Sequence, residues 1–265
     1  MLLAIDVGNT NTVFALYRER EQVGQWRLST NRERTSEEYA ALLIQLMGLA
    51  GFTPEGVGAV VIASVVPAAV MPLRRMSRDF FACDAFVVGE DLDYPIRIDL
   101  ANPAEVGADR VVNAVAALTR YRPPLVIVDF GTATTFDVVD RDGTYRGGAI
   151  APGINLSIDA LARAAAKLPR IAIAAPERVI GRSTIEAMQS GIFWGYVGLI
   201  EGLVRRIVEE HGEPMTVIAT GGLASLFYER AGLFDHLDRD LTMAGLLEIY
   251  EHNRERVRAG KRERG

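Results

Sequence analysis

The chain has 265 residues, 49% of them hydrophobic, with a formal net charge of −5. This length suits two domains, and the mild charge argues against a general nucleic-acid-binding surface. We expect no signal peptide and no membrane span. The single cysteine, Cys83, excludes an intrachain disulfide and a cysteine metal cluster and suits a reducing cytoplasm.

The first half of the chain is predicted to form a β-hairpin sheet followed by alternating helices and strands. Predicted strands cover 2–5, 11–17, 22–28, 58–64 and 86–88, and predicted helices cover 36–49, a stretch beginning at Pro67, and 111–121. Proline suits the first helical turn because it lacks an N–H that would have no partner there. Residues 91–103 are expected to form a loop. This order is typical of a ribonuclease-H-like domain.

The second half repeats this plan, and Pro123-Pro124 marks the expected domain boundary. Predicted strands cover 125–128, 134–139, 144–150 and 216–219, and predicted helices cover 154–166, a long stretch ending near His211, and 244–250. Ser183 and Glu186 have the spacing of a capping box. We therefore predict an α/β protein with two ribonuclease-H-like domains, 1–122 and 123–251, whose mixed sheets are flanked by helices, and a solvated basic tail over 252–265.

One motif occurs twice, at 5–14 and at 128–137, and each copy ends a short apolar run. Alignment of the copies pairs Asp6 with Asp129, Gly8 with Gly131, and Thr12 with Thr135. Each copy predicts a strand, a tight turn and a second strand. The glycine allows close approach of the backbone to a ligand, and the aspartate offers a carboxylate for a cation. Either copy alone is equally typical of an ordinary hairpin turn, but the repeat favours a site for a phosphate chain and its metal.

Lysine is almost absent, since only Lys167 and Lys261 occur. No Walker-type G-x-x-x-x-G-K-[ST] sequence is present. A phosphate site in this chain must therefore use backbone N–H groups, hydroxyls, arginine and metal ions.

Asp109 is the sharpest single candidate for chemistry. It lies at the predicted start of a helix, where N–H groups and the helix dipole favour an ionised carboxylate that can accept a proton. Arg110 beside it can meet an anionic group. The alternative is a capping aspartate beside a surface arginine. Thr184, after Gly181-Arg182, has the same ambiguity between a cap and a ligand contact.

Two groups of glycines also call for an explanation. Thr220-Gly221-Gly222 follows a predicted strand and would suit a nucleoside lying against the backbone, or a plain turn. Glycine weakens a helix, so its recurrence in the long helix indicates close packing against another helix, of this chain or of a partner. The recurring positions are Gly191, Gly195, Gly198 and Gly202.

Five motifs, in order, give the chain a resemblance to the type III pantothenate kinases. They are Asp6-Val7-Gly8-Asn9-Thr10, Ala63-Ser64-Val65-Val66-Pro67, Asn102-Pro103 with Gly107-Ala108-Asp109-Arg110, Asp129 to Thr135, and Gly147 to Gly153. The resemblance extends to about Tyr250. It implies the actin-like ATPase (ASKHA) fold and ATP-dependent phosphorylation of pantothenate, the first step of coenzyme A biosynthesis.

The resemblance also implies roles for residues of this chain. Nucleotide-binding roles fall on Asp6, Val7, Gly8, Asn9, Thr10, Asn11, Thr12, Val13 and Thr132. Asp6 would organise Mg²⁺ through water, and Asp129 would bind a monovalent cation, K⁺ or NH₄⁺. Gly107, Ala108, Asp109 and Arg110 would line the pantothenate site, with Asp109 as general base. Thr184 would complete that site from the other subunit of a homodimer.

One position departs from the family pattern, because Leu100 stands where several relatives carry a tyrosine near the substrate. That substrate contact is therefore not expected in its usual form. Two other functions are compatible with the fold: an accessory regulator of transcription, and an ATP or polyphosphate hydrolase. The sequence contains no DNA-binding motif, and a hydrolase needs no alcohol-activating base, so the set Asp6, Asp109 and Asp129 favours the kinase.

Overall fold

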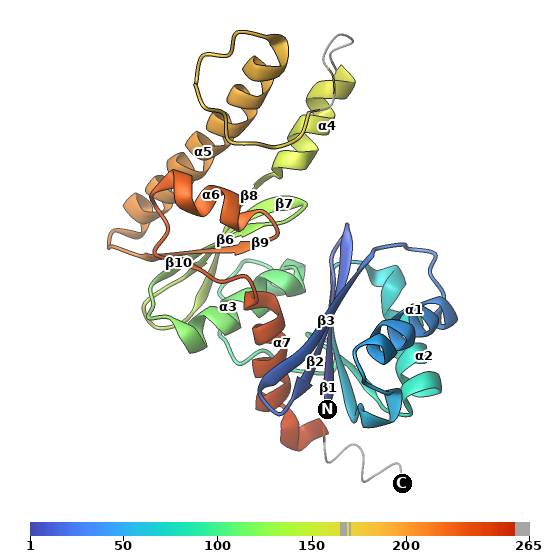
Figure 1. Ribbon diagram of the computed structural model, residues 1–265. Coiled ribbons are helices and arrows are strands. Elements are labelled where there is room, and N and C mark those ends of the chain that lie inside the picture. The colour runs from blue at the N-terminus through green and yellow to red at the C-terminus, as the bar shows by residue number, and fades with distance from the viewer. Residues whose placement is uncertain (165–168, 170, 258–265) are drawn as a thin grey trace. The chain divides into compact units, whose positions relative to one another are not determined.

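The structure is a computed structural model that describes residues 1–164, 169 and 171–257 (Figure 1). The chain divides into two compact units. The first contains residues 1–97, 101–119 and the chain from 240 onward, and the second contains 98–100 and 120–239. Among the described residues, no helix is long and apolar enough to cross a membrane.

The first unit is built on a five-stranded sheet of order β3-β2-β1-β4-β5. Its elements are β1 (Leu2–Val7), β2 (Asn11–Arg18), β3 (Glu21–Ser29), α1 (Ser36–Leu49), η1 (Pro54–Gly56), β4 (Ala59–Ser64), α2 (Pro67–Phe81), β5 (Ala85–Val87), η2 (Pro103–Glu105), α3 (Ala108–Arg120) and α7 (Leu241–His252). β1 is antiparallel to β2 and parallel to β4. The expected hairpin, helices and strands of this half are therefore confirmed.

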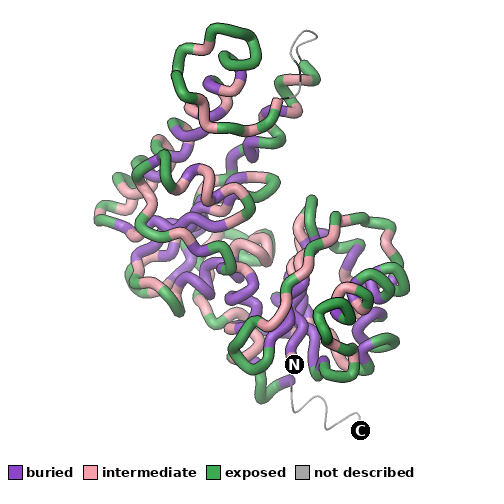
Figure 2. Tube along the Cα trace, in the orientation of Figure 1, coloured by how far each residue is buried: buried purple, intermediate pink, exposed green. Residues whose placement is uncertain are grey.

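Side chains alternate between the two faces of each strand, and different helices cover the two faces of this sheet. Leu3, Ile5 and Val7 pack into one core with residues of α1 and α2 such as Leu43 and Leu73. Burial of one such side chain stabilises the fold by about 1.5–3 kcal/mol. β1 is buried along almost its whole length (Figure 2). α7 contacts β1 and β4.

The second unit repeats the topology, with strand order β10-β9-β6-β7-β8. Its elements are β6 (Leu125–Phe130), β7 (Ala133–Val139), β8 (Tyr145–Pro152), α4 (Ile154–Ala164), α5 (Thr184–His211), β9 (Thr216–Gly221), α6 (Ala224–Ala231) and β10 (His236–Leu237). β6 is antiparallel to β7 and parallel to β9, as β1 is to β2 and β4. The predicted α/β fold with two ribonuclease-H-like halves is confirmed.

The two compact units differ from the expected domains chiefly in the C-terminal part of the chain, which belongs to the first unit. The boundary was expected at 122/123, whereas the change of unit lies at 119/120, and the chain returns to the first unit at Asp240. The reason is packing: Thr242 Oγ1 donates to Asn113 Oδ1 over 2.7 Å. The backbone of Gly245 lies so close to Val112 that an added methyl group would be 2.1 Å from its carbonyl oxygen.

Several local predictions need correction. Part of the expected solvated tail is packed, because Asn253 and Val257 are buried and Asn253 Nδ2 donates to the carbonyl of Asp93. The expected tail from 258 and helix positions 165 and 166 lie outside the described residues. Ser183 caps α5 by accepting from the N–H of Glu186, but the Glu186 carboxylate accepts from Arg182 N–H, so the capping box is incomplete.

Candidate active site

The first polar turn joins β1 to β2 at the carboxyl end of β1. The N–H of Gly8 donates to the carbonyl of Asn11 over 2.9 Å, which closes the turn. Asn9, Thr10 and Asn11 are exposed, Asp6 and Gly8 are half-buried, and Val7 is buried. The turn therefore presents amide and hydroxyl groups outward above a strand-end carboxylate.

Thr12 lies beneath this turn. It is fully buried, and its hydroxyl is hydrogen-bonded to Thr30 Oγ1 at 3.0 Å. Thr30 in turn donates to the carbonyl oxygen of Gly8 over 2.7 Å. Thr12 thus braces the turn from the core side, whereas the half-buried Val13 is the strand partner of Asp6.

The second polar turn joins β6 to β7 and is one residue shorter. Here the N–H of Gly131 donates to the carbonyl of Ala133 over 3.1 Å. Asp129 pairs with Thr135 as Asp6 pairs with Val13. The structural counterpart of Thr12 is therefore Thr134, not Thr135 as the sequence alignment indicated, because that alignment took the two turns to be of equal length.

Asp129 is held in a narrow space at the carboxyl end of β6. β9 runs parallel to β6, which pairs Asp129 with Thr220. Gly221 has φ +93°, and a methyl group on it would lie 2.4 Å from Asp129 Oδ1. The glycine of Thr220-Gly221-Gly222 therefore lets the β9 backbone approach the carboxylate.

The start of α4 closes the second turn from another side. A methyl group on Gly153 would lie 2.2 Å from the carbonyl oxygen of Thr132 and 2.9 Å from that of Gly131. Thr132 itself is half-buried. The turn is thus packed between β9 and the first residues of α4, with no room for a side chain at either glycine.

Asp109 lies in the first turn of α3, as predicted. Its Oδ1 accepts from the N–H of Arg110 over 2.8 Å. Burial raises the pKa of the Asp109 carboxyl above its usual value, although this hydrogen bond and the Arg110 guanidinium lower it. The helix start was expected to favour the ionised carboxylate, but burial acts against this and is the larger effect on the pKa. A raised pKa brings the carboxylate closer in basicity to a group that accepts a proton near neutral pH.

The Asp109 turn meets the same edge of the sheet as the first polar turn. Val65 N–H donates to the carbonyl of Val7, directly before Gly8. A methyl group on Gly107 would lie 3.6 Å from Val65 Cγ1 and 2.6 Å from Asp109 Oδ1. The first unit therefore brings the polar turn, the end of β4 and the start of α3 together.

Tyr94 is a residue at this site that the motifs did not indicate. Burial raises its pKa, and the negative charge of Asp109 raises it further. A methyl group on Gly89, at φ +82°, would lie 2.8 Å from the Tyr94 hydroxyl. Leu100, by contrast, groups with the second unit and lies against Gly147. The signal that could have found Tyr94 is an aromatic residue in the loop expected over 91–103, shortly before the Asp109 motif.

Thr184 belongs to the second unit, at the start of α5, and is exposed. The glycine positions of α5 also face outward: methyl groups on Gly191, Gly195 or Gly198 would meet nothing within 4 Å. Exposed apolar side chains occur on the same unit, with fractional exposures of 64% for Ile150, 65% for Val179, 83% for Ile180 and 50% for Ile185. Among the described residues, the glycine stripe is therefore not explained by packing within the chain.

The candidate metal ligands of the site are isolated carboxylates and do not form a cluster of several ligands. Among the described residues, no group of three or more histidine, cysteine, aspartate or glutamate side chains is arranged to hold a metal ion. Mg²⁺ that arrives with a nucleotide needs only one or two carboxylates, because water and phosphate oxygens complete its shell. Asp6, at the end of β1, is a half-buried carboxylate that fits this requirement.

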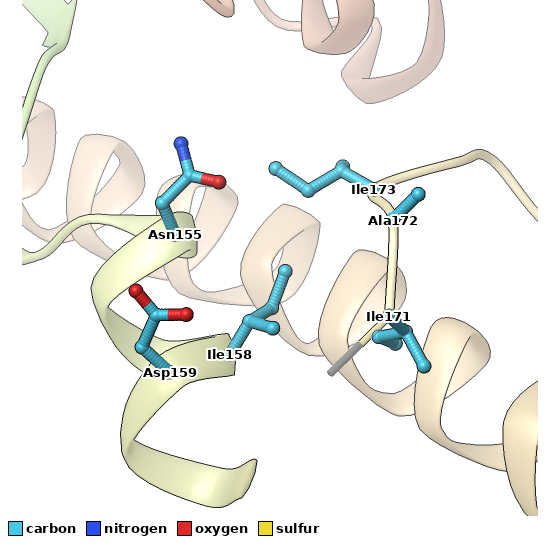
Figure 3. Close-up of a pocket in the computed structure, with 6 residues that line it drawn as sticks. All are labelled: Asn155, Ile158, Asp159, Ile171, Ala172 and Ile173. Carbon is cyan, nitrogen blue, oxygen red and sulfur yellow. The ribbon is translucent and has the colours of Figure 1, made fainter. Parts of the chain in front are cut away.

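A cavity of about 390 Å³ lies elsewhere in the second unit (Figure 3). Asn155, Ile158 and Asp159 project from α4, and residues 171–173 form the opposite wall. Its walls contain none of the predicted site residues, and we assign it no role.

Solved structures with a similar fold include nucleotide-binding proteins. The chain matches an activator of 2-hydroxyisocaproyl-CoA dehydratase from Clostridium difficile, solved with bound ADPNP, with a TM-score of 0.56 and 11% identity over 99% of this chain and 97% of the other. It also matches a Baf family transcriptional activator from Campylobacter jejuni, with a TM-score of 0.61 and 19% identity over 96% and 99%. Two repeated units, each with a polar turn after its first strand, give the chain the fold of these structures, the actin-like ATPase fold.

Sequence relatives narrow this class to one family. A profile of the type III pantothenate kinases matches residues 2–206. A type III pantothenate kinase from Paramagnetospirillum magneticum is 58% identical over 97% of this chain and 100% of its own length. One from Rhodospirillum rubrum is 58% identical over 96% and 99%. The chain belongs to the type III pantothenate kinase family.

Proposed function

We propose that this protein transfers the γ-phosphoryl group of ATP to the terminal hydroxyl of pantothenate, the first step of coenzyme A biosynthesis. The observation that carries the proposal is the convergence of an outward-facing polar turn and a desolvated carboxylate, Asp109, at one edge of the first sheet. Such a reaction needs phosphate positioning, charge neutralisation and a proton acceptor. The family relatives give the substrate class.

In this proposal Asp109 accepts the proton of the pantothenate hydroxyl at a carboxylate oxygen, and Arg110 meets the anionic end of the substrate. Gly107 and Ala108 complete the wall of that pocket. Residues 6–13 and Thr132 bind the nucleotide through backbone N–H groups and hydroxyls. Mg²⁺, held through water near Asp6, supplies charge neutralisation at the phosphate oxygens when bound.

We infer that Asp129 holds a monovalent cation, K⁺ or NH₄⁺. Two observations support this inference: the Asp129 carboxylate lies in a confined space beside Gly221, and the chain has only two lysines. ATP brings several negative charges, and a fixed cation with oxygen ligands offsets part of them where other kinases use a lysine.

We further propose a homodimer in which Thr184 completes the substrate pocket of the partner subunit. The outward-facing glycines of α5 and the exposed apolar side chains beside its start support this arrangement. An interface made by one patch on both copies is the commonest form of symmetric association. The cytoplasm is the proposed location, because ATP-dependent metabolic kinases act there.

The regulatory alternative is not favoured. The similar Campylobacter jejuni protein, at 19% identity, shows the fold alone, whereas the curated relatives at 58% identity are named as kinases. A hydrolase on the same fold needs no base that activates an alcohol, which is the role proposed here for Asp109.

The test is an assay of the purified protein with ATP, Mg²⁺, K⁺ and pantothenate, followed by mass spectrometry of the products. We expect ADP and 4′-phosphopantothenate in equal amounts. ADP with inorganic phosphate, formed equally fast without pantothenate, would indicate the hydrolase instead.

A further inference from the structure

The hydroxyl of Tyr196, on α5, joins two segments beneath the second turn. It is hydrogen-bonded to Thr134 Oγ1, and the two residues are 5% and 0% exposed. Its ring is fixed between Phe130 and Phe227, whose centroids lie 6.2 and 5.0 Å away. These ring contacts hold the Tyr196 hydroxyl oxygen beside Thr134.

The start of α4 and the carboxylate of Asp129 also affect the pKa of the Tyr196 hydroxyl. Burial raises the pKa of Tyr196, whereas hydrogen bonds with Thr134 and the backbone of Ile154 lower it, and the charge of Asp129 raises it. Ile154 follows Gly153, whose backbone lies against the carbonyl of Thr132. The Tyr196 hydroxyl therefore lies between Thr134, at the start of β7, and Ile154, the first residue of α4.

The first unit has a partly similar arrangement. Thr12 occupies the position of Thr134, and Tyr39 on α1 lies near it, but the Thr12 hydroxyl is bonded to Thr30 and the buried Tyr39 hydroxyl has no hydrogen-bond partner among the described residues. Phe14 and Tyr39 are in edge contact at 6.4 Å. In both units, a buried threonine at the start of the second strand meets a tyrosine from a helix on the core face of the sheet.

We propose that Tyr196 is a positioning residue for the nucleotide, whose hydroxyl holds Thr134 and the start of α4 so that Thr132 and Asp129 keep their geometry. The proposal rests on the nucleotide and cation roles proposed above for this turn. Tyr196 acts through Thr134 and Ile154 rather than by touching a substrate. A tyrosine that served only the core would affect stability and leave the ligand preferences of the turn unchanged.

The experiment compares Tyr196→Phe and Thr134→Val, each of which removes one hydroxyl, with the double variant. Tyr228→Phe is the matched control, since its ring packs on Phe234 in the same unit. We expect the dissociation constant for a non-hydrolysable ATP analogue, measured by calorimetry, to rise about five-fold in either single variant, as loss of one buried hydrogen bond predicts. The half-activating K⁺ concentration should rise with it, and the KM for pantothenate should not change.

The double variant should bind nucleotide no more weakly than Tyr196→Phe alone, because Tyr196→Phe already lacks the hydrogen bond between the two hydroxyls. Nucleotide affinity and K⁺ activation that equal those of the wild type in folded Tyr196→Phe would overturn the proposal. So would a fall in melting temperature with all ligand constants unchanged. Thr132→Ala separates this outcome from failure of the turn assignment: if Thr132→Ala also binds nucleotide normally, the second turn is not a nucleotide site.

Discussion

Asp109 is subject to two opposing effects at the start of α3. The Arg110 N–H and guanidinium favour its charged form, and burial favours its neutral form more strongly, so the pKa is raised. The position of a residue in a helix can be predicted from sequence, but its burial depends on tertiary neighbours of this region, such as Tyr94 and Val65. The sequence therefore predicted the position of Asp109 at a helix start, which the structure confirms, but not the effect of burial on its pKa.

Replacement of Asp109 by asparagine tests its proposed role as the base. Asp109→Asn keeps size and hydrogen-bonding ability but cannot accept a proton, so turnover should fall about 100-fold or more. Glu105→Gln, which alters an exposed carboxylate nearby, should have little effect. Near-normal turnover of folded Asp109→Asn would exclude the role.

The raised pKa of Asp109 also predicts the direction of the pH dependence. The base works only when deprotonated, so kcat/KM should decrease as the pH falls through the Asp109 pKa, at a higher pH than for an ordinary aspartate. A pH–rate profile of wild type and Asp109→Asn checks this, since the residual activity of the variant should lack that acid limb. An acid limb that persists unchanged in the variant would assign it to another group.

At the scale of elements, long periodic segments were predictable and short or shifted ones were not. The bounds of α1 match the sequence-based prediction, because its apolar spacing is unambiguous. α6 has eight residues and β10 has two, too few for a periodic pattern to form. The one-residue difference between the polar turns was also invisible, since only strand pairing shows that Thr134 corresponds to Thr12.

The end of β9 offers a sharp test of the second turn. A methyl group on Gly221 would meet Asp129 Oδ1 at 2.4 Å in a backbone conformation that alanine rarely adopts, whereas one on Gly222 would meet nothing within 4 Å. Gly221→Ala should therefore weaken nucleotide binding at least ten-fold, and Gly222→Ala should leave it near wild type. Calorimetric titration with an ATP analogue measures both, and equal affinities would show that Asp129 tolerates displacement.

For the whole molecule, the proposed cation predicts a dependence on salt identity. At constant ionic strength, wild-type activity should collapse when K⁺ is replaced by Na⁺ or a bulky organic cation, and NH₄⁺ should restore it, because its size is similar. Asp129→Ala should be poor in every salt. Equal wild-type rates in all salts would mean that Asp129 holds no essential cation.

The proposed homodimer predicts complementation between damaged chains. When Asp109→Asn and Thr184→Ala chains are mixed and allowed to exchange, each heterodimer contains one intact site, so activity should recover to about a quarter of wild type at random pairing. Each variant alone is the control. A fully active monomer in sedimentation at assay concentration would contradict the shared site.

The return of the chain to the first unit at Asp240 affects the order in which the two units can fold while the ribosome synthesises the protein. The ribosome delivers the first sheet early, but α7, which contacts β1 and β4, emerges only after residues 120–239 have been made. At about 5–20 residues per second, the nascent first unit waits on the order of ten seconds before Gly245 and Thr242 reach their neighbours Val112 and Asn113. The second unit is nearly continuous in sequence and can fold in that interval. We therefore expect the second unit to complete its folding before the first unit, although synthesis of the first unit begins earlier.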